Sequence, residues 1–306
     1  MTSSIHPTVR LNKHQQLKGI WNKRTYVIIR LIGEGARGSI YLALLGNRYV
    51  ALKISQDSSV ITAEVNVLKM LKKVQGQPLG PLLLDVDDAY VSQSSKLAFY
   101  VMEYIDGVPL GQWIEREGLS WMFPISFQLL SQLNQLHQLG YIYGDLKPDN
   151  ILIDKRTKHA RLIDVGGVTA FNRSIREYTT WYDRGYWKMG DRRAEPTYDL
   201  FAYAVCLLNM DPHVKIQKSS ERDILKLLNQ AKSLKPIHHV LNHAFHGKYQ
   251  SALEMKKDLE HINAQQMKKP QSNYNTPSPK LNVWPETIGI SSIIFIHVAL
   301  FYYFIL

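Results

Sequence analysis

An acid, a base and an amide lie within six positions of one another in the stretch 143–150, which reads YGDLKPDN. Asp145 has the chemistry to accept a proton from an attacking hydroxyl, and Lys147 to hold a transferring phosphate. Asn150 offers a side-chain oxygen to a metal ion. Phosphoryl transfer needs these three roles close together, because its catalysis consists mostly of positioning and charge neutralisation. The stretch therefore predicts a catalytic loop for phosphoryl transfer.

Three glycines, Gly33, Gly35 and Gly38, separate two apolar stretches with the composition of strands, 26–32 and 39–44. This order predicts a hairpin whose tip lies over a phosphate chain, because backbone amides approach phosphate oxygens most closely without a Cβ. A dinucleotide-binding fold would need a helix directly after the glycines. Arg37 adds a positive charge at the tip, and two interpretations stay open: a phosphate contact or an exposed loop charge.

Further charged residues stand where an apolar element makes them informative. Lys53 lies inside the apolar strand 49–54, which is costly unless its ammonium group meets an anion. The helical pattern over 57–73 carries Glu64, the predicted partner of Lys53. Asp164 ends another apolar strand and precedes two glycines. Its carboxylate and the oxygen of Asn150 suit Mg²⁺ held against phosphate oxygens.

The remaining pattern predicts strands at 82–86 and 97–102, with Asp87 to Ala89 in the connection between them. The backbone of Glu103 and Ile105 suits the edge of an adenine ring. Helices are expected over 110–117, 123–139, 224–234, 237–245 and 252–262. His137, at the end of one of them, is interpreted as a structural histidine.

Taken together, the glycines, the lysine–glutamate pair, the loop 145–150 and Asp164 with Gly166 resemble a eukaryotic-type (Hanks-type) protein kinase over residues 26–265, with a compact plan like the bacterial members. The resemblance implies an α+β bilobal fold, with a β-rich N-lobe at 26–105, a helical C-lobe at 106–265, and ATP between them. It also implies Asp145 as catalytic base beside Lys147, Mg²⁺ on Asn150 and Asp164, and serine or threonine hydroxyls of proteins, including the kinase itself, as substrates. The implied ATP-binding positions are Ile32, Gly33, Gly35, Gly38, Ile40, Ala51, Lys53, Glu64, Glu103 and Ile105.

The chain departs from the family pattern around the predicted loop. Tyr143-Gly144 replaces the usual histidine–arginine pair, which removes the clamp for a phosphorylated activation loop. Ser174, Thr179 and Thr180 are therefore expected to tolerate joint replacement by alanine with residual activity. The alanine-proline-glutamate motif is not evident over 179–187, and Lys248 stands where its arginine partner is expected. Asp199 resembles the aspartate that supports the catalytic loop.

Two other functions are compatible with this fold. A small-molecule kinase of the aminoglycoside-kinase type shares the aspartate–asparagine loop, although Lys147-Pro148 and the full set of glycines argue against it. A pseudokinase acting as a membrane-bound scaffold would fit the altered motifs. The intact polar and charged residues at 53, 64, 145, 150 and 164 argue against the pseudokinase hypothesis.

Composition and the two ends bound the remaining possibilities. The chain has 306 residues, a net charge of +11 and one cysteine, Cys206, so an internal disulfide is excluded. No arginine-rich block or zinc pattern supports a nucleic-acid partner; a phosphate ligand or an anionic membrane explains the charge equally well. Residues 1–25 are expected to form a lead-in strand or arm.

The C-terminal residues predict a membrane anchor. Residues 266–287 have the composition of a disordered linker, and 288–306 form an apolar run without formal charge. As a helix that run is about 28 Å long, enough to cross a bilayer core. Lys268, Lys269 and Lys280 precede it, so the positive-inside rule predicts a tail-anchored protein with its kinase domain in the cytoplasm.

Overall fold

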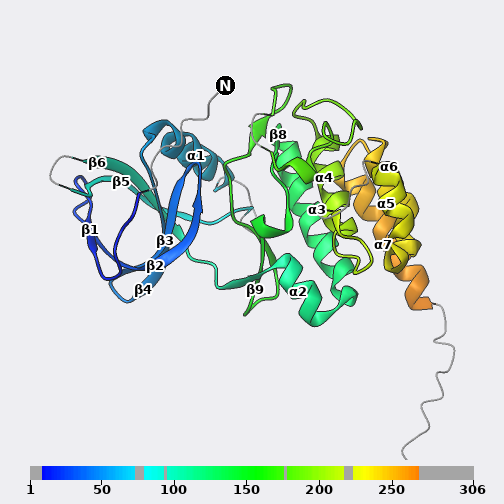
Figure 1. Cartoon of the computed structure of the whole chain (residues 1–306), viewed down its shortest axis with the longest axis horizontal. Helices are drawn as coiled ribbons and strands as arrows, with labels where there is room; N and C mark the ends of the chain where they lie inside the picture. Colours follow the sequence, from blue (N-terminus) through cyan, green and yellow to red (C-terminus); the bar gives the residue numbers. More distant parts are fainter. Residues whose placement is uncertain (1–8, 73–78, 93–94, 176–177, 217–222, 269–306) are drawn as a thin grey trace, which may run out of the picture. The chain divides into compact units, whose positions relative to one another are not determined.

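The computed structural model describes residues 9–72, 79–92, 95–175, 178–216 and 223–268 (Figure 1). The chain divides after Gln265 into two units, and nearly all described residues belong to the first. The predicted membrane segment 288–306 and nearly all of the predicted linker 266–287 lie outside the described residues. Among helices of the described part, none has the length and apolar character needed to span a membrane.

The N-terminal lobe is built on one antiparallel sheet in the order β1-β2-β3-β4-β6-β5. Its strands are β1 Gln16–Lys18, β2 Thr25–Gly35, β3 Gly38–Leu45, β4 Arg48–Ser55, β5 Leu83–Tyr90 and β6 Lys96–Glu103. β4 lies inside the sheet, and every residue from Val50 to Ser55 is buried. A strand that is covered on both faces typically has a continuous run of apolar residues. Lys53 interrupts that run.

Residues 9–25 belong to this lobe, because β1 pairs with β2 and Leu17 is buried. The expectation of a connection at 87–89 was wrong, since β5 continues through Tyr90. Asp87 is 4% exposed and accepts hydrogen bonds from the backbone N–H groups of Trp21 at 2.9 Å and Asn22 at 2.7 Å. Consecutive acids usually indicate a turn, but here a distant segment supplies the donors that a buried carboxylate needs.

Helix α1, Ser58–Leu71, packs on the sheet (Figure 1). Asp57 caps it by accepting from the N–H of Ser59 at 2.8 Å. Its buried residues recur at helical spacing and form one stripe: Ile61, Glu64, Val65, Leu68 and Leu71. Glu64 thus faces the interior along with the apolar side chains of that stripe.

The C-terminal lobe is mainly helical, and α4 lies in its core, with every residue from Tyr198 to Leu208 buried. Its helices are α2 Leu110–Glu117, α3 Met122–Gln138, α4 Pro196–Leu208, α5 Ile224–Gln230, α6 His238–Phe245 and α7 Ala252–Lys268. α5 ends earlier than the sequence predicted. Ala231, at φ −76° and ψ 74°, leaves the helical conformation, and a 3₁₀ segment, Lys232–Ile237, follows it.

Short strand pairs hold both ends of the stretch 143–150. β8 Tyr141–Ile142 pairs with β11 Thr169–Ala170 immediately before it. β9 Ile151–Asp154 begins immediately after it and pairs with β7 Gly107–Pro109 and β10 Ala160–Leu162. The stretch is therefore fixed at both ends, although it has little regular structure of its own.

Candidate active site

Lys53 and Glu64 form the buried ion pair that the sequence predicted. Lys53 Nζ lies 2.7 Å from Glu64 Oε1, and the two residues are 4% and 1% exposed. The hydroxyl of Tyr100 donates to Glu64 Oε2 at 3.0 Å. Burial and the charge of Glu64 raise the pKa of Tyr100 well above its usual value, so this hydroxyl keeps its proton. The carboxylate is thus oriented by donors on both oxygens.

Asp199 of α4 holds the start of the predicted catalytic loop. Its carboxylate accepts the backbone N–H groups of Tyr143 at 2.7 Å and Gly144 at 2.9 Å, and His137 Nε2 lies 2.8 Å from it. Asp199 is fully buried, and burying a carboxylate costs free energy unless hydrogen-bond donors surround it. Each of these partners offsets part of that cost. His137 has the structural position that the sequence predicted.

Gly144 has a backbone conformation that the sequence did not reveal. Its φ is +82°, and a Cβ built there would lie 2.3 Å from the carbonyl oxygen of Gly167. A residue with a side chain would meet both conformational strain and a collision with backbone. The glycine is therefore required by the path of this loop, whatever the consequence for regulation.

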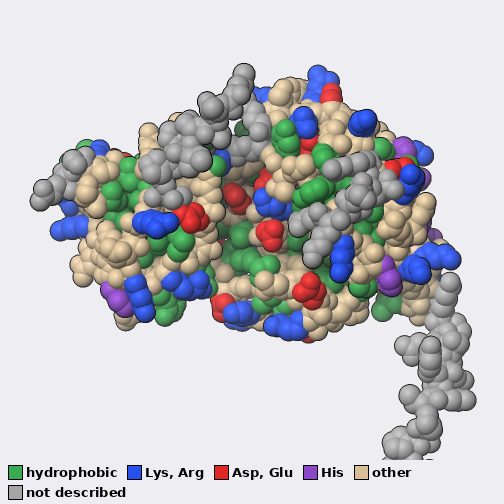
Figure 2. Space-filling view, viewed as in Figure 1, with side chains coloured by type: hydrophobic (Ala, Val, Ile, Leu, Met, Phe, Trp, Pro, Cys, Tyr) green, Lys and Arg blue, Asp and Glu red, His purple; other side chains and the backbone are tan. Residues whose placement is uncertain are grey.

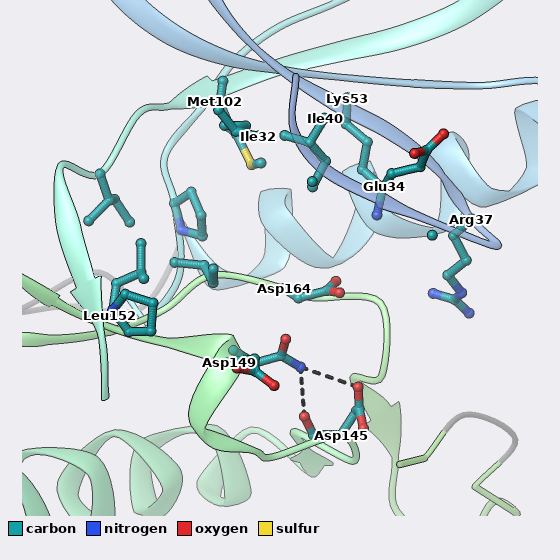
Figure 3. Close-up of a pocket in the computed structure, with 18 of the residues that line it drawn as sticks. Ile32, Glu34, Arg37, Ile40, Lys53, Met102, Asp145, Asp149, Leu152 and Asp164 are labelled. Carbon is teal, nitrogen blue, oxygen red and sulfur yellow. Dashed lines mark hydrogen bonds between the residues drawn. The ribbon is translucent and has the colours of Figure 1, made fainter. Parts of the chain in front are cut away.

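Asp145 is surrounded by donors. Lys147 Nζ lies 2.7 Å from its Oδ2, and the Thr179 hydroxyl donates to Oδ1 at 2.8 Å. Asn150 Nδ2 donates to the backbone carbonyl of Asp145 at 2.8 Å and lies 3.2 Å from Oδ2 (Figure 3). Lys147 Nζ also donates to Thr179 at 2.9 Å. These contacts fix the carboxylate in one orientation at the edge of the cleft.

Thr179 is a site residue that sequence reasoning missed. Its hydroxyl joins Asp145 and Lys147 from a segment more than thirty residues further along the chain. The sequence treated it as one of three replaceable loop hydroxyls together with Ser174 and Thr180. No local pattern distinguishes it from Thr180, since only the fold of the intervening segment selects which threonine reaches Asp145.

Asn150 and Asp164 are brought together by the β9–β10 hairpin. Ile163 N–H donates to the carbonyl oxygen of Asn150 at 3.0 Å, so the residue before Asp164 is bonded to the asparagine. Gly166 N–H donates to Asp164 Oδ1 at 2.9 Å and orients the carboxylate. Because Asn150 Nδ2 is engaged by Asp145, its Oδ1 is the atom that can face a cation. These oxygen donors fit a hard divalent ion such as Mg²⁺.

All of the predicted site residues except Glu64 line one cavity of about 1200 Å³ between the lobes, and Glu64 lies buried behind Lys53. Figure 2 shows a hollow on this face with acidic and apolar side chains inside it. In Figure 3, Met102 and Leu152 face the cavity from opposite lobes, and Lys53 and Asp164 lie further toward Arg37. A Cβ added at Gly35 would meet no atom within 4 Å, so open space lies beside the glycine hairpin. The cavity suits a ligand with an apolar ring system and an anionic chain.

The segment joining the two lobes is tied to both of them. Glu103, at the end of β6, binds Arg161 of β10 at 2.8 Å. Its backbone N–H donates to Leu82 O at 2.8 Å. The backbone carbonyl of Glu103 is therefore the group that can contact the edge of an adenine ring. Ile105 is buried and lines the cavity. Met102 and Leu152 also line it and were absent from the sequence prediction.

The region that lacks the alanine-proline-glutamate motif is held by its own ion pairs. Arg184, 6% exposed, binds Glu195 at 2.6 Å and Thr197 Oγ1 at 2.7 Å. Burial raises the pKa of Glu195, but hydrogen bonds from Arg184 and Thr197 outweigh it and lower the pKa overall. Asp183, fully buried, pairs with Arg192 at 2.6 Å. These pairs lie within residues 183–197 and do not involve Lys248.

A cleft between a β-rich and a helical lobe, with these charged groups at one end, is the arrangement that the resemblance to protein kinases implies. The model of the protein kinase domain matches residues 26–272. The chain therefore belongs to the protein kinase family.

The relatives narrow this assignment. Serine/threonine-protein kinase YabT of Bacillus subtilis is 45% identical over 246 residues, covering 79% of this chain and 73% of YabT. A cell division control protein 2 homologue of Trypanosoma brucei is 30% identical over 61% of this chain and 56% of its own length. Two solved structures share the fold. The kinase domain of Mycobacterium tuberculosis PknI matches with a TM-score of 0.58 and 17% identity, over 83% of this chain and 100% of its own length. Vaccinia related kinase 3 matches with a TM-score of 0.63 and 15% identity, over 87% of this chain and 94% of its own length. The chain is a serine/threonine protein kinase.

Proposed function

We propose that this kinase transfers the γ-phosphoryl group of ATP to serine and threonine hydroxyls of proteins, itself included, in a Mg²⁺-dependent reaction at the cytoplasmic face of a membrane. The observation that supports the chemistry best is the convergence on one cavity of Lys53, which is paired with Glu64, the Asp145 cluster and the residues Asn150 and Asp164.

The residues divide the work by charge and position. Lys53, oriented by Glu64, holds the α- and β-phosphates, and Lys147 neutralises the group in transfer. Asp145 accepts the proton of the substrate hydroxyl. In the structure its Oδ1 already accepts a hydrogen bond from another hydroxyl, that of Thr179. Asn150 and Asp164 would hold Mg²⁺, which when bound neutralises phosphate charge. The base of ATP lies among the apolar side chains at the other end of the cavity.

Asp145→Asn tests the proposed base. The variant should lose transfer to a protein substrate by at least about 100-fold, the contribution of general base catalysis, while its affinity for ATP is unchanged. Glu260→Gln, an exposed carboxylate on α7, is the control. Transfer that survives in Asp145→Asn would remove Asp145 from this role.

The wild-type chain decides between the proposed function and its alternatives. Labelled ATP with Mg²⁺ should transfer label to the kinase and to added protein. ATP binding without any transfer would support the scaffold interpretation, and transfer only to an aminoglycoside would support a small-molecule kinase. The label should disappear when EDTA removes Mg²⁺.

The membrane location rests on the composition of 288–306 and needs its own test. The full chain should sediment with membranes, and deletion of 288–306 should release it. Replacing Ile294 and Leu300 together with arginine keeps the length and should release it too, because each central charge costs about 3 kcal/mol. Both variants should keep their kinase activity. Continued sedimentation of both would show that the anchor lies elsewhere.

A further inference from the structure

Arg37 is outside the roles proposed so far, although it lies at the tip of the glycine hairpin (Figure 3). Its Nη1 donates to the carbonyl oxygen of Gly166 at 2.7 Å and lies 3.4 Å from Glu64 Oε1. One guanidinium group therefore connects three segments: the β2–β3 hairpin, helix α1 and the loop that follows Asp164. Gly166 belongs to the C-terminal lobe, so the contact also links the two lobes beside the glycine hairpin. The sequence allowed two interpretations of Arg37, a phosphate contact or an exposed loop charge. The bonds to Gly166 and Glu64 agree with neither interpretation.

The receiving positions leave room for the guanidinium and supply its acceptors. A Cβ at Gly166 would lie 2.5 Å from Arg37 Nη1 and 3.2 Å from Glu64 Oε1, so a side chain there would displace the arginine. Glu64 Oε1 accepts Lys53 as well, at 2.7 Å. A planar guanidinium with several N–H donors can serve two acceptors at once, whereas an ammonium group on a flexible stem is less well suited.

We propose that Arg37 is a positioning residue that assembles the catalytic arrangement before nucleotide binds. It acts through Glu64 and Gly166, and thereby on Lys53 and Asp164, which are the groups that the proposed function requires. The chain has glycine at 144, where the resemblance leads one to expect an arginine that binds a phosphorylated loop. A cation from the opposite lobe, bonded to a backbone carbonyl and a buried carboxylate, orders the same cleft without needing a phosphate.

Hydrogen exchange of the nucleotide-free full chain tests this directly. Arg37→Met should raise exchange about tenfold in peptides covering 33–40 and 164–170, because the bond to Gly166 is lost. Arg48→Met, which removes an exposed charge at the start of β4, should leave both peptides unchanged. Arg37→Gln is the second variant should Arg37→Met fold poorly. Unchanged exchange in both Arg37 variants would overturn the proposal.

Kinetics separate positioning from direct phosphate binding. Arg37→Met should lower kcat about tenfold with less than a threefold change in KM for ATP, and Arg37→Lys should recover part of kcat. In a Glu64→Gln background the same change should lower kcat by a smaller factor than in wild type, because one of the two groups through which the arginine acts is altered. A rise confined to KM for ATP, undiminished in that background, would show phosphate binding instead. Since the exchange measurement uses no nucleotide, it stands whether or not the proposed reaction is found.

Discussion

At the scale of single residues, one hydroxyl from outside the catalytic stretch completes the surroundings of Asp145. Thr179 donates to one carboxylate oxygen and accepts from Lys147, which itself lies on the other oxygen. The three groups form a closed ring of contacts. Removing the hydroxyl takes away one of the contacts that orient the proposed base and its cation, so the threonine is a positioning residue for the proposed reaction.

Thr179→Ala should therefore lower kcat about tenfold, because a hydrogen bond to a charged group contributes about 1.5 kcal/mol. Thr179→Ser should retain most of the activity, since it keeps the hydroxyl. Thr180→Ala, the exposed neighbour, is the matched control and should behave as wild type. Steady-state kinetics with a protein substrate measure all three. Equal activities of the two alanine variants would favour the original expectation that these hydroxyls are replaceable.

At the scale of elements, the catalytic loop is shaped by contacts with α4 and with the loop after Asp164. Asp199 accepts two consecutive backbone N–H groups, and Gly144 approaches Gly167 too closely for a side chain. In this loop the glycine at 144 thus has a left-handed backbone and no room for a Cβ. Restoring the arginine alone would not restore the phosphate clamp.

Gly144→Arg should destabilise the fold and lower activity, and Gly144→Ala should do the same because the Cβ is the cause. The expected loss is about 2 kcal/mol or more from left-handed strain and the clash together. Gly140 is a close control, since its φ is +81° and a Cβ there meets nothing within 4 Å; Gly140→Ala should cost only the strain, about 1–2 kcal/mol. Urea denaturation measures the difference. Higher activity in Gly144→Arg would show that a missing clamp limits the enzyme.

At the scale of the whole folded unit, Trp21 and Asn22, which precede β2, are bonded to the far edge of the sheet. Asp87 on β5 accepts backbone N–H groups from Trp21, Asn22 and Asp88. Burial raises the pKa of Asp87, but these backbone donors outweigh it, and the net pKa is lowered. A carboxyl group whose pKa is lowered in the folded state stabilises the fold at pH values above its pKa in the unfolded chain. That stabilisation is lost as the pH falls through the lowered, folded-state pKa.

Stability should therefore decrease as the pH drops below about 4, the unfolded pKa of an aspartate. Asp87→Asn should be less stable at pH 7, by about 1–3 kcal/mol for the buried donors left unpaired, and its stability should depend less on pH between 5 and 3. Asp106→Asn, which loses only an exposed pair with Lys155, is the control. Urea denaturation across this range tests it. An unchanged slope in Asp87→Asn would mean that other acids dominate.

The sequence by itself determined the family and most elements of the fold. Strands and helices have a period that neighbouring residues reveal, and Lys53 was conspicuous because it interrupts an apolar strand. Its pairing with Glu64 followed from the same logic, because a buried ammonium group needs an anionic partner. The membrane segment stays a prediction, since it lies outside the described residues.

Only the tertiary structure decided which distant residues complete these motifs. Thr179 and Thr180 are alike in sequence, but the chain's path brings only Thr179 to Asp145. Arg37 was ambiguous until the closed cleft placed Gly166 beside it. Buried Asp87 looked like a turn residue because its donors come from another segment. Local periodicity reports whether an element is buried, whereas these contacts depend on where the fold places segments that are distant in the sequence, which no single stretch encodes.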